Sequence, residues 1–234
     1  SLTKELARTH LIGAGGSGMS GLAQLLAELG ISVSGCDRTA SEVTDGLNQS
    51  KIPISIGHDI GHLSDCETVI FSSAIRQENP ELKLAKNRGL QVLHRAEALS
   101  RVVQGKRIIA VAGTHGKTSS TAMLATALKR HGVDAGVVNG GVISEWGVSA
   151  RWGDAPEFVI EADESDGSFS NYDPAIVLIT NIAPDHLDFY GSIDSIDSAF
   201  ENFARSASEA VVLCSDDDGA SRLARKVEKS AKVI

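Results

Sequence analysis

Short apolar runs alternate with amphipathic stretches along the chain. The first run covers residues 9–12, and in the stretch that follows it apolar residues recur at steps of three and four, from Met19 to Leu29. A short apolar run is typical of a buried strand, and the second spacing is typical of a helix that packs by one face. Because the pair of patterns repeats, the sequence predicts an α/β fold built from βαβ units with parallel strands.

The same patterns predict the remaining elements. Pro80 near the start and Gly89 after the end delimit one helix, and further helices are expected over residues 95–103 and over a long stretch that ends at Gly132. The acidic run at 215–219 is interpreted as a helix start. The other expected strands cover residues 31–35, 52–56, 68–72, 91–93, 108–112, 133–138, 158–162, 176–180 and 210–214.

A short polar joint, "QGKR" at 104–107, separates two series of these units. With 234 residues, the chain is long enough for two small domains that each bury a core. We therefore expect a Rossmann-like domain over residues 1–104 and a second α/β domain over residues 105–234.

Charge and cysteine content narrow the function classes. The formal net charge is −8, whereas nucleic acids and anionic membranes attract basic surfaces, so we expect neither as a partner. No apolar run approaches a membrane span, and the first residues do not look like an export signal. The three cysteines are widely spaced, which predicts neither a disulfide framework nor a zinc knuckle and fits the cytoplasm.

A glycine-rich turn follows the first strand, with Gly13, Gly15 and Gly18 at the spacing of a dinucleotide-binding fingerprint. Such glycines let the backbone approach a diphosphate at a helix N-terminus. Together with Asp37, the acid at the end of the second strand, they leave an NAD-dependent oxidoreductase as one alternative. The fingerprint alone is a weak signal.

A second phosphate loop, "AGTHGKTSS", follows the strand expected at 108–112. Gly116, Lys117 and Thr118 match the end of a P-loop, whereas Val111 stands where the pattern begins with glycine. In such a loop the lysine neutralises the nucleotide phosphates and the hydroxyl reaches Mg²⁺. The structural alternative is a glycine turn with a solvated Lys117, and a P-loop switch without chemistry is a further alternative.

Two later strands deliver polar residues at their ends. The strand at 158–162 leads into four acids, any of which could hold Mg²⁺ or simply cap a turn: Glu161, Asp163, Glu164 and Asp166. The strand at 176–180 leads into Asn181, Asp185, His186 and Asp188. His186 is a candidate ligand for a second cation, although a lone turn histidine is more often structural. We expect all three strand ends to meet at one edge of a parallel sheet.

Two histidines outside these loops, His58 and His62, lie four residues apart. Gly57 and Gly61 argue against a helical zinc pair at this position.

With these residues assembled, the chain resembles the Mur ligase family, which joins amino acids to a sugar nucleotide in peptidoglycan synthesis, and within it the alanine-adding branch. Seven motifs carry the resemblance, in the family's order and over nearly the whole chain: "GAGGSGMSGLA", "SGCD", "IGHD", "SSAIRQENPEL", "AGTHGKTSSTAML", "EADESDGSF" and "TNIAPDHLDFYGS". The resemblance implies a Rossmann-like domain for a UDP-sugar, followed by a P-loop ATPase domain.

The resemblance also implies roles for individual residues. Lys117, Glu161 and His186 would be catalytic; Thr118 and Glu161 would bind one Mg²⁺, and Glu161 and His186 a second. The ATP loop would comprise Gly113, Thr114, His115, Gly116, Lys117, Thr118 and Ser119. The UDP-sugar site would comprise Gly13, Gly15, Gly16, Ser17, Gly18, Met19, Asp37, His58, Ser72 and Ser73.

The implied substrates are UDP-N-acetylmuramate, ATP and L-alanine. The sugar's lactyl carboxylate would attack the γ-phosphoryl group of ATP, and the amine of alanine would then attack the resulting acyl phosphate. The resemblance also implies a carboxyl-terminal domain beyond this chain and a central domain that is incomplete here, so we expect the fragment alone to be inactive. Another Mur-type peptide ligase is an alternative reading, and a homodimer is an open alternative to a monomer.

Overall fold

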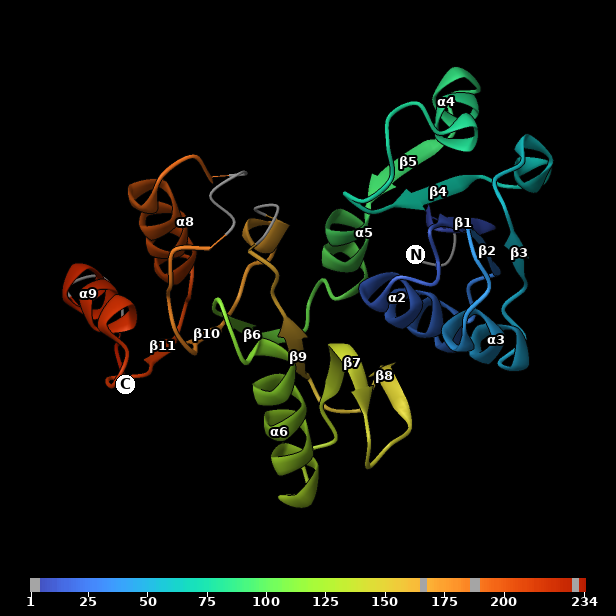
Figure 1. Cartoon of the computed structure of the whole chain (residues 1–234). Coiled ribbons are helices and arrows are strands. Elements are labelled where there is room, and N and C mark those ends of the chain that lie inside the picture. The colour runs from blue at the N-terminus through green and yellow to red at the C-terminus, as the bar shows by residue number, and fades with distance from the viewer. Residues whose placement is uncertain (1–4, 165–167, 186–189, 229–231) are drawn as a thin grey trace. The chain divides into compact units, whose positions relative to one another are not determined.

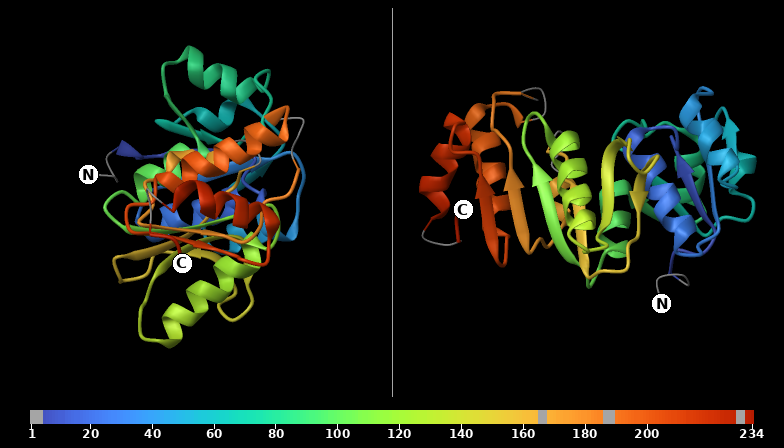
Figure 2. Two further views of the ribbon diagram at one scale, coloured as in Figure 1. Left: turned by 90° about the vertical axis from the view of Figure 1, so that its left-hand side faces the viewer. Right: turned by 90° about the horizontal axis from the view of Figure 1, so that it is seen from below.

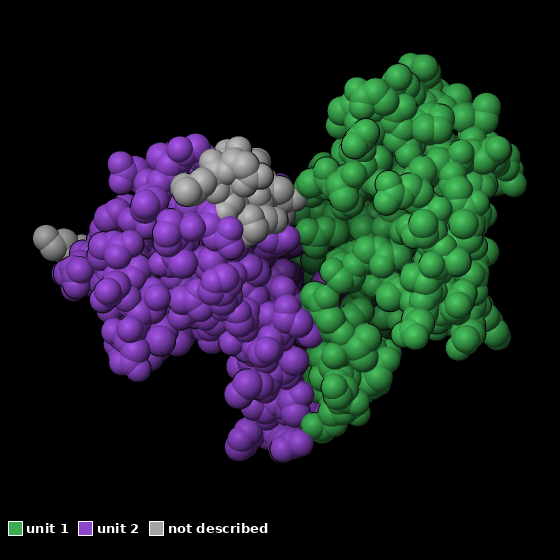
Figure 3. Space-filling view, in the orientation of Figure 1, with its two compact units in different colours: residues 1–104, 140–152 green, residues 105–139, 153–234 purple. Residues whose placement is uncertain are grey.

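The computed structural model describes residues 5–164, 168–185, 190–228 and 232–234. The chain divides into two compact units, which Figure 3 colours green and purple. Unit 1 comprises residues 1–104 and 140–152, and unit 2 comprises residues 105–139 and 153–234.

Unit 1 contains a parallel sheet of five strands in the order β3-β2-β1-β4-β5. This is a doubly wound order. From β1 the chain adds β2 and β3 on one side and then β4 and β5 on the other side, so the strand order reverses between β1 and β4. In such sheets, ligands bind beyond the carboxyl ends of the two strands at the reversal. The strands are β1 (Thr9–Ile12), β2 (Val33–Asp37), β3 (Ile54–Ile56), β4 (Thr68–Phe71) and β5 (Gln91–His94).

The helices of unit 1 alternate with these strands along the chain, as Figure 1 shows. Helix α4 begins with Pro80, and the Asn79 side chain accepts hydrogen bonds from the backbone N–H groups of Glu81 and Leu82. The helices are α2 (Ser17–Glu28), α3 (Glu42–Gln49), α4 (Pro80–Asn87) and α5 (Arg95–Val102), with the 3₁₀ helix η1 (Ile60–Leu63).

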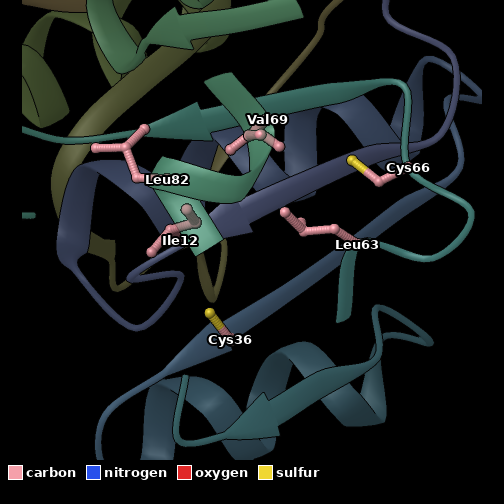
Figure 4. Packing of buried hydrophobic residues seen from close by; sticks show 7 residues of the cluster. Ile12, Cys36, Leu63, Cys66, Val69 and Leu82 are labelled. Carbon is pink, nitrogen blue, oxygen red and sulfur yellow. The ribbon is translucent and has the colours of Figure 1, made fainter. Parts of the chain in front are cut away.

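One face of this sheet packs against η1 and α4 (Figure 4). Paired residues on neighbouring strands and alternate residues along one strand point to the same face. Ile12 pairs with Cys36, and Val69 pairs with the residue two positions before Ile12, so all three lie on this side. They pack with residues of the covering elements, Leu63 and Leu82, and all five are fully buried. Burial of these apolar side chains holds η1 and α4 against this face of the sheet.

The second sheet has the order β11-β10-β6-β9-β7-β8 and lies mainly in unit 2, with β6 near its centre (Figures 1 and 2). Strands β11, β10, β6, β9 and β7 pair in parallel. Val111 pairs with Glu161 and Ala112 with Ile179, so three strands end at one level. The strands are β6 (Arg107–Ala112), β7 (Gly136–Ile143), β8 (Val148–Arg151), β9 (Glu157–Glu161), β10 (Ile176–Ile179) and β11 (Ala210–Leu213).

Helix α6 packs on β6 and β9, and α9 packs on α8 and β11. Asp217 caps α9 by accepting a hydrogen bond from the Ala220 backbone N–H, which confirms the helix start predicted from the acidic run. The helices of unit 2 are α6 (Lys117–Arg130), α8 (Ile193–Arg205) and α9 (Asp218–Val227), with the 3₁₀ helix η2 (Ser168–Asn171).

The predicted α/β class is confirmed, and each expected strand has its counterpart. Strand β7 differs most, because it begins later and runs further than the expected 133–138. Residues 140–152, the end of β7 and all of β8, cluster with unit 1, whereas two continuous domains were expected. Within unit 1, the Glu28 carboxylate accepts a hydrogen bond from the Trp152 backbone N–H, and β8 packs on α2.

None of the helices in the described ranges combines the length and the apolar sequence that crossing a membrane requires.

Removal of a buried aromatic ring from the core of unit 2 should lower the free energy of unfolding substantially. Phe158 in β9 is fully buried, so Phe158→Ala should lower the free energy of unfolding by about 3–5 kcal/mol. Met123→Ala on α6 is the control, because the Met123 side chain is 72% exposed and its loss should change little. Urea unfolding followed by circular dichroism measures both variants. Equal midpoints for the two would contradict this assignment of the core.

Candidate functional site

The turn between β6 and α6 has room only for glycine at its first position. Gly113 has φ +133°, and a Cβ there would lie 2.1 Å from Thr180 Oγ1 and 3.0 Å from the Asn181 carbonyl oxygen. Any larger residue would both strain the backbone and push the end of β10 away. The loop therefore needs Gly113 even though Val111 occupies the usual first glycine position of a P-loop.

The end of β10 holds this loop through hydrogen bonds. The Asn181 amide oxygen accepts from the His115 backbone N–H at 2.9 Å, and the Asn181 amide nitrogen donates to the His115 carbonyl at 2.8 Å. Thr180 Oγ1 donates to the same carbonyl at 2.7 Å. Thr114 Oγ1 accepts from the Ala183 backbone N–H at 2.9 Å. These bonds fix the backbone of the loop before any ligand binds.

The start of α6 is open to an anion. Its N-cap is Gly116, at φ +81°, and no side chain caps it. The first N–H groups of a helix have no partner within the helix, and the positive end of the helix dipole lies there. An open pocket of about 450 Å³ lies at this point, lined by Thr114, His115, Gly116, Lys117, Thr118, Glu161 and Asp163. The site therefore suits a phosphate group.

Lys117 is fixed by two contacts within this pocket. Its Nζ donates to the Gly113 carbonyl at 2.8 Å and to the Glu164 carboxylate at 2.9 Å. The side chains are 14% and 3% exposed, so this ion pair is largely shielded from water. Burial raises the pKa of Glu164 above its usual value, against the lowering effect of Lys117. A bound phosphate would compete with Glu164 for the lysine.

Oxygen donors lie beside the lysine. Thr118 Oγ1 donates to Glu161 Oε1 at 3.0 Å, which brings the start of α6 to the end of β9. Hydroxyl and carboxylate oxygens are the ligands that Mg²⁺ prefers, so Thr118 and Glu161 suit this ion. Asp163 lines the same pocket. His186, the expected ligand of a second cation, lies outside the described residues.

A second pocket, of about 550 Å³, lies in unit 1 at the reversal between β1 and β4. Residues that follow the ends of the first four strands line it, among them Gly13, Gly16, Asp37, Arg38, His58, Ser72 and Arg76. Five of the residues expected to bind the UDP-sugar therefore share one cavity. Arg38 and Arg76 add positive charge to the lining, which suits an anionic ligand.

The glycine loop of this pocket has its own constraints. Gly13 has φ +81°, and the Gly15 backbone N–H donates to Asp37 Oδ2 at 2.8 Å. A Cβ on Gly15 would lie 2.8 Å from that same oxygen, and one on Gly18 would lie 2.5 Å from Arg95 Nη1. Asp37 therefore stabilises the loop as well as lining the pocket.

Several predicted site residues lie elsewhere. Met19 is buried in the core, and Ser17 lines a neighbouring cavity with α3 and β8. Ser73 Oγ lies 3.0 Å from His94 Nε2, outside the lining of the unit 1 pocket. Ser119 is exposed on α6 and does not line the phosphate pocket. Ligand roles for these four residues stay predictions.

Sequence reasoning missed the roles of five residues. Arg38 and Arg76 follow the strands β2 and β4, and basic residues at these strand ends were an available signal. Thr180, Asn181 and Glu164 stood within motifs that were singled out, but the spacing did not indicate that they contact the loop or the lysine.

Two families match the chain in sequence. Residues 8–107 match the Mur ligase family, catalytic domain, and residues 111–234 match the Mur ligase middle domain. A UDP-N-acetylmuramate–L-alanine ligase of Clavibacter sepedonicus is 50% identical over 224 residues, which are 96% of this chain and 47% of that protein. The chain spans about half the length of the curated relatives it matches.

Solved structures agree with these matches. A UDP-N-acetylmuramate-alanine ligase from Thermotoga maritima has a TM-score of 0.85 and 34% identity, covering 92% of this chain and 51% of that one. A UDP-N-acetylmuramate:L-alanyl-gamma-D-glutamyl-meso-diaminopimelate ligase from Neisseria meningitides has a TM-score of 0.89 and 28% identity, covering 97% of this chain and 77% of that one. With both units matched in sequence and in structure, the chain belongs to the Mur ligase family.

Proposed function

We propose that this chain forms the sugar-nucleotide and ATP-binding part of a ligase that joins L-alanine to UDP-N-acetylmuramate. The observation that carries the proposal is the pocket at the ends of β6 and β9, where Lys117, Thr118 and Glu161 line one cavity. A cation, a hydroxyl and a carboxylate at a helix N-terminus form the donor set of a nucleotide-phosphate site. The 50% identity to a named alanine ligase supports the substrate.

In this proposal, each unit binds one nucleotide. Unit 1 would bind UDP-N-acetylmuramate in the pocket at the β1–β4 reversal, where the glycine loop and Arg38 and Arg76 would meet the diphosphate. Unit 2 would bind ATP at the start of α6. An NAD site is the weaker reading of unit 1, because it leaves the second phosphate pocket without a role.

The proposed reaction forms an amide bond in two steps. The lactyl carboxylate of the sugar attacks the γ-phosphorus of ATP, which gives an acyl phosphate and ADP. The amine of L-alanine then attacks the acyl carbon, loses a proton, and phosphate leaves. No step needs a covalent bond to the protein, so catalysis would consist mainly of positioning and charge neutralisation.

Residues of this chain have separate tasks in the first step. Lys117 would leave Glu164 and neutralise phosphate oxygens, while the first N–H groups of α6 would orient them. Thr118 and Glu161 would hold Mg²⁺, which when bound offsets negative charge on the phosphates. The second-cation role of Glu161 and His186 rests on the resemblance alone.

The choice of amino acid rests on the sequence comparison. The printed names of the two structural relatives share UDP-N-acetylmuramate and differ in what is joined to it. Alanine is preferred here because of the closer sequence identity to alanine ligases. A cytoplasmic location fits three free cysteines, and it stays a prediction, as does a homodimer.

The first prediction concerns Lys117. Lys117→Ala should weaken ATP binding to this chain by roughly 10- to 100-fold, because a charge-assisted hydrogen bond contributes about 1.5–3 kcal/mol. In the full-length ligase, turnover should fall by about two orders of magnitude or more, since such a contact contributes on the order of 3 kcal/mol to the barrier. Calorimetry and phosphate release measure the two effects.

Lys129→Ala is the matched control, because Lys129 lies on the same helix and pairs with Asp134 away from the pocket. Its ATP affinity and turnover should match those of the unaltered protein. Normal phosphate release by Lys117→Ala would remove the assignment of this loop to ATP.

The second prediction concerns Gly16. A Cβ there would meet nothing closer than 3.4 Å, so Gly16→Ala should fold normally. Gly16 lines the pocket of unit 1, and an added methyl would obstruct close approach of a diphosphate to the backbone. We expect a loss of UDP-N-acetylmuramate affinity of about tenfold, or about 1.4 kcal/mol, with unchanged ATP affinity.

Gly46→Ala on α3 is the control, since Gly46 lies outside this pocket and a Cβ there would have open space. The titrations use UDP-N-acetylmuramate, ATP and NADH with the unaltered chain and both variants. Binding of NADH with no binding of UDP-N-acetylmuramate would overturn the assignment of unit 1 in favour of the oxidoreductase reading.

A further inference from the structure

Four metal-ligating side chains of unit 1 converge behind the sugar-nucleotide pocket. They are His10 on β1, Cys36 on β2, His62 in η1 and Glu81 in α4. One ligand atom from each lies within 4.8 Å of all the others. His10, Cys36 and Glu81 are buried, and His62 is partly exposed.

Glu81 is the centre of this cluster. Its side chain is fully buried, and its Oε1 lies 2.6 Å from His62 Nδ1 and 3.7 Å from His10 Nε2. The Cys36 thiol donates to Oε2 at 3.0 Å. Burial raises the pKa of the carboxyl, but the close approach of His10, Cys36, His62 and His58 together lowers it to about 2. Glu81 is therefore a carboxylate with both oxygens facing nitrogen and sulfur donors.

His10 is held in an orientation that leaves one nitrogen available. Its Nδ1 lies 2.9 Å from Ser34 Oγ, and its side chain is 2% exposed. Within the described ranges, the other ring nitrogen, Nε2, has no hydrogen-bond partner and faces Glu81. A buried polar atom without a partner is costly, and a histidine fixed through one nitrogen is the usual arrangement of a metal ligand.

The donor set favours one class of ion. Thiolate and imidazole ligands select Zn²⁺ over Mg²⁺ or Ca²⁺, and one thiolate, two imidazoles and the Glu81 carboxylate supply the four ligands of a closed tetrahedral site. Zinc bond lengths of about 2.0–2.3 Å place tetrahedral ligand atoms about 3.3–3.8 Å apart, within the range of separations in this cluster. We propose that His10, Cys36, His62 and Glu81 form a structural Zn²⁺ site.

Zinc binding at this site balances charge and protons. The Cys36 thiol gives up its proton to solvent, and the thiolate and the Glu81 carboxylate together neutralise the two charges of the ion. His10 and His62 bind as neutral imidazoles through Nε2 and Nδ1. His58 stays outside the ligand set, with its Nδ1 2.9 Å from Glu81 Oε2, where it orients the carboxylate.

The proposed site uses His62 as a ligand although His58 and His62 do not form a zinc-binding pair on one helix. His58 lies in the turn before η1 and His62 within it, and the other ligands come from two strands and from α4. Zinc would therefore link four elements at the point where β2 delivers Asp37 to the neighbouring pocket. This inference does not depend on the reaction proposed for the protein.

The test is metal binding by the whole chain. The chain is stripped with chelator and titrated with Zn²⁺, and metal content is measured after desalting; we expect one equivalent. With Co²⁺ in place of Zn²⁺, a tetrahedral visible spectrum with a thiolate charge-transfer band is expected. Cys36→Ser should abolish the band and weaken Zn²⁺ binding by more than about 100-fold.

Cys66→Ser is the matched control, because Cys66 is also buried in unit 1, its thiol donates to the Thr68 carbonyl, and it is not one of the four candidate ligands. Cys214→Ser controls for the exposed thiol. Both should keep the band. Ser34→Ala keeps every ligand and should weaken Zn²⁺ binding by about 10- to 100-fold, so the proposal is testable even if Cys36→Ser misfolds.

Three outcomes would overturn the proposal. The first is a chain that retains no zinc and shows no cobalt band, which would make the cluster a hydrogen-bonded carboxylate only. The second is equal Zn²⁺ affinity in the unaltered chain, Cys36→Ser and Ser34→Ala. The third is a band lost only in Cys214→Ser, which would show adventitious binding at the exposed thiol.

Discussion

Parallel pairing of β6 with β9 and β10 is the constraint on which the pocket at the start of α6, proposed to bind ATP, depends. The register sets Val111 beside Glu161 and Ala112 beside Ile179, so the phosphate loop, the acidic strand end and the Thr180–Asn181 turn begin at one level. A slip by two residues would move Glu161 about 6.6 Å along its strand, out of reach of Thr118. The buried apolar side chains of these strands therefore determine where the polar groups meet.

In unit 1, a different set of contacts holds the loop that lines the pocket. Its pocket also lies beyond the ends of parallel strands, and a neighbouring strand end again holds the loop, here through the carboxylate of Asp37, the last residue of β2. In unit 2, Asn181 and Thr180 hold the loop and leave Lys117 to pair with Glu164. The Asp37 carboxylate thus stabilises the loop itself in unit 1, whereas the Glu164 carboxylate stabilises the side chain of Lys117 in unit 2.

Much of this could be predicted from the sequence, because strands, helix caps and glycine turns are encoded by neighbouring residues. The order of elements and the two loops follow from such local patterns, whereas the pairing of Glu161 with Thr118 was expected only from the family resemblance. Contacts between distant segments do not follow from local patterns. Ser149 lies 125 positions from Gln24, its hydrogen-bond partner, so the grouping of residues 140–152 with unit 1 had no local signal. Lys117 and Glu164 are 47 positions apart, and the four acids of that stretch were expected as ligands of Mg²⁺, not as partners of the lysine.

Donor chemistry separates the two cation sites that the chain would carry. Thr118 and Glu161 offer only oxygen, which suits Mg²⁺ and binds it weakly enough for exchange with each nucleotide. Cys36 and two imidazoles offer sulfur and nitrogen, which bind Mg²⁺ poorly. Since Cys36 immediately precedes Asp37, a permanent ion at the end of β2 would hold the carboxylate that supports the glycine loop. Zinc would then act on sugar-nucleotide binding through the position of Asp37, without contacting the ligand itself.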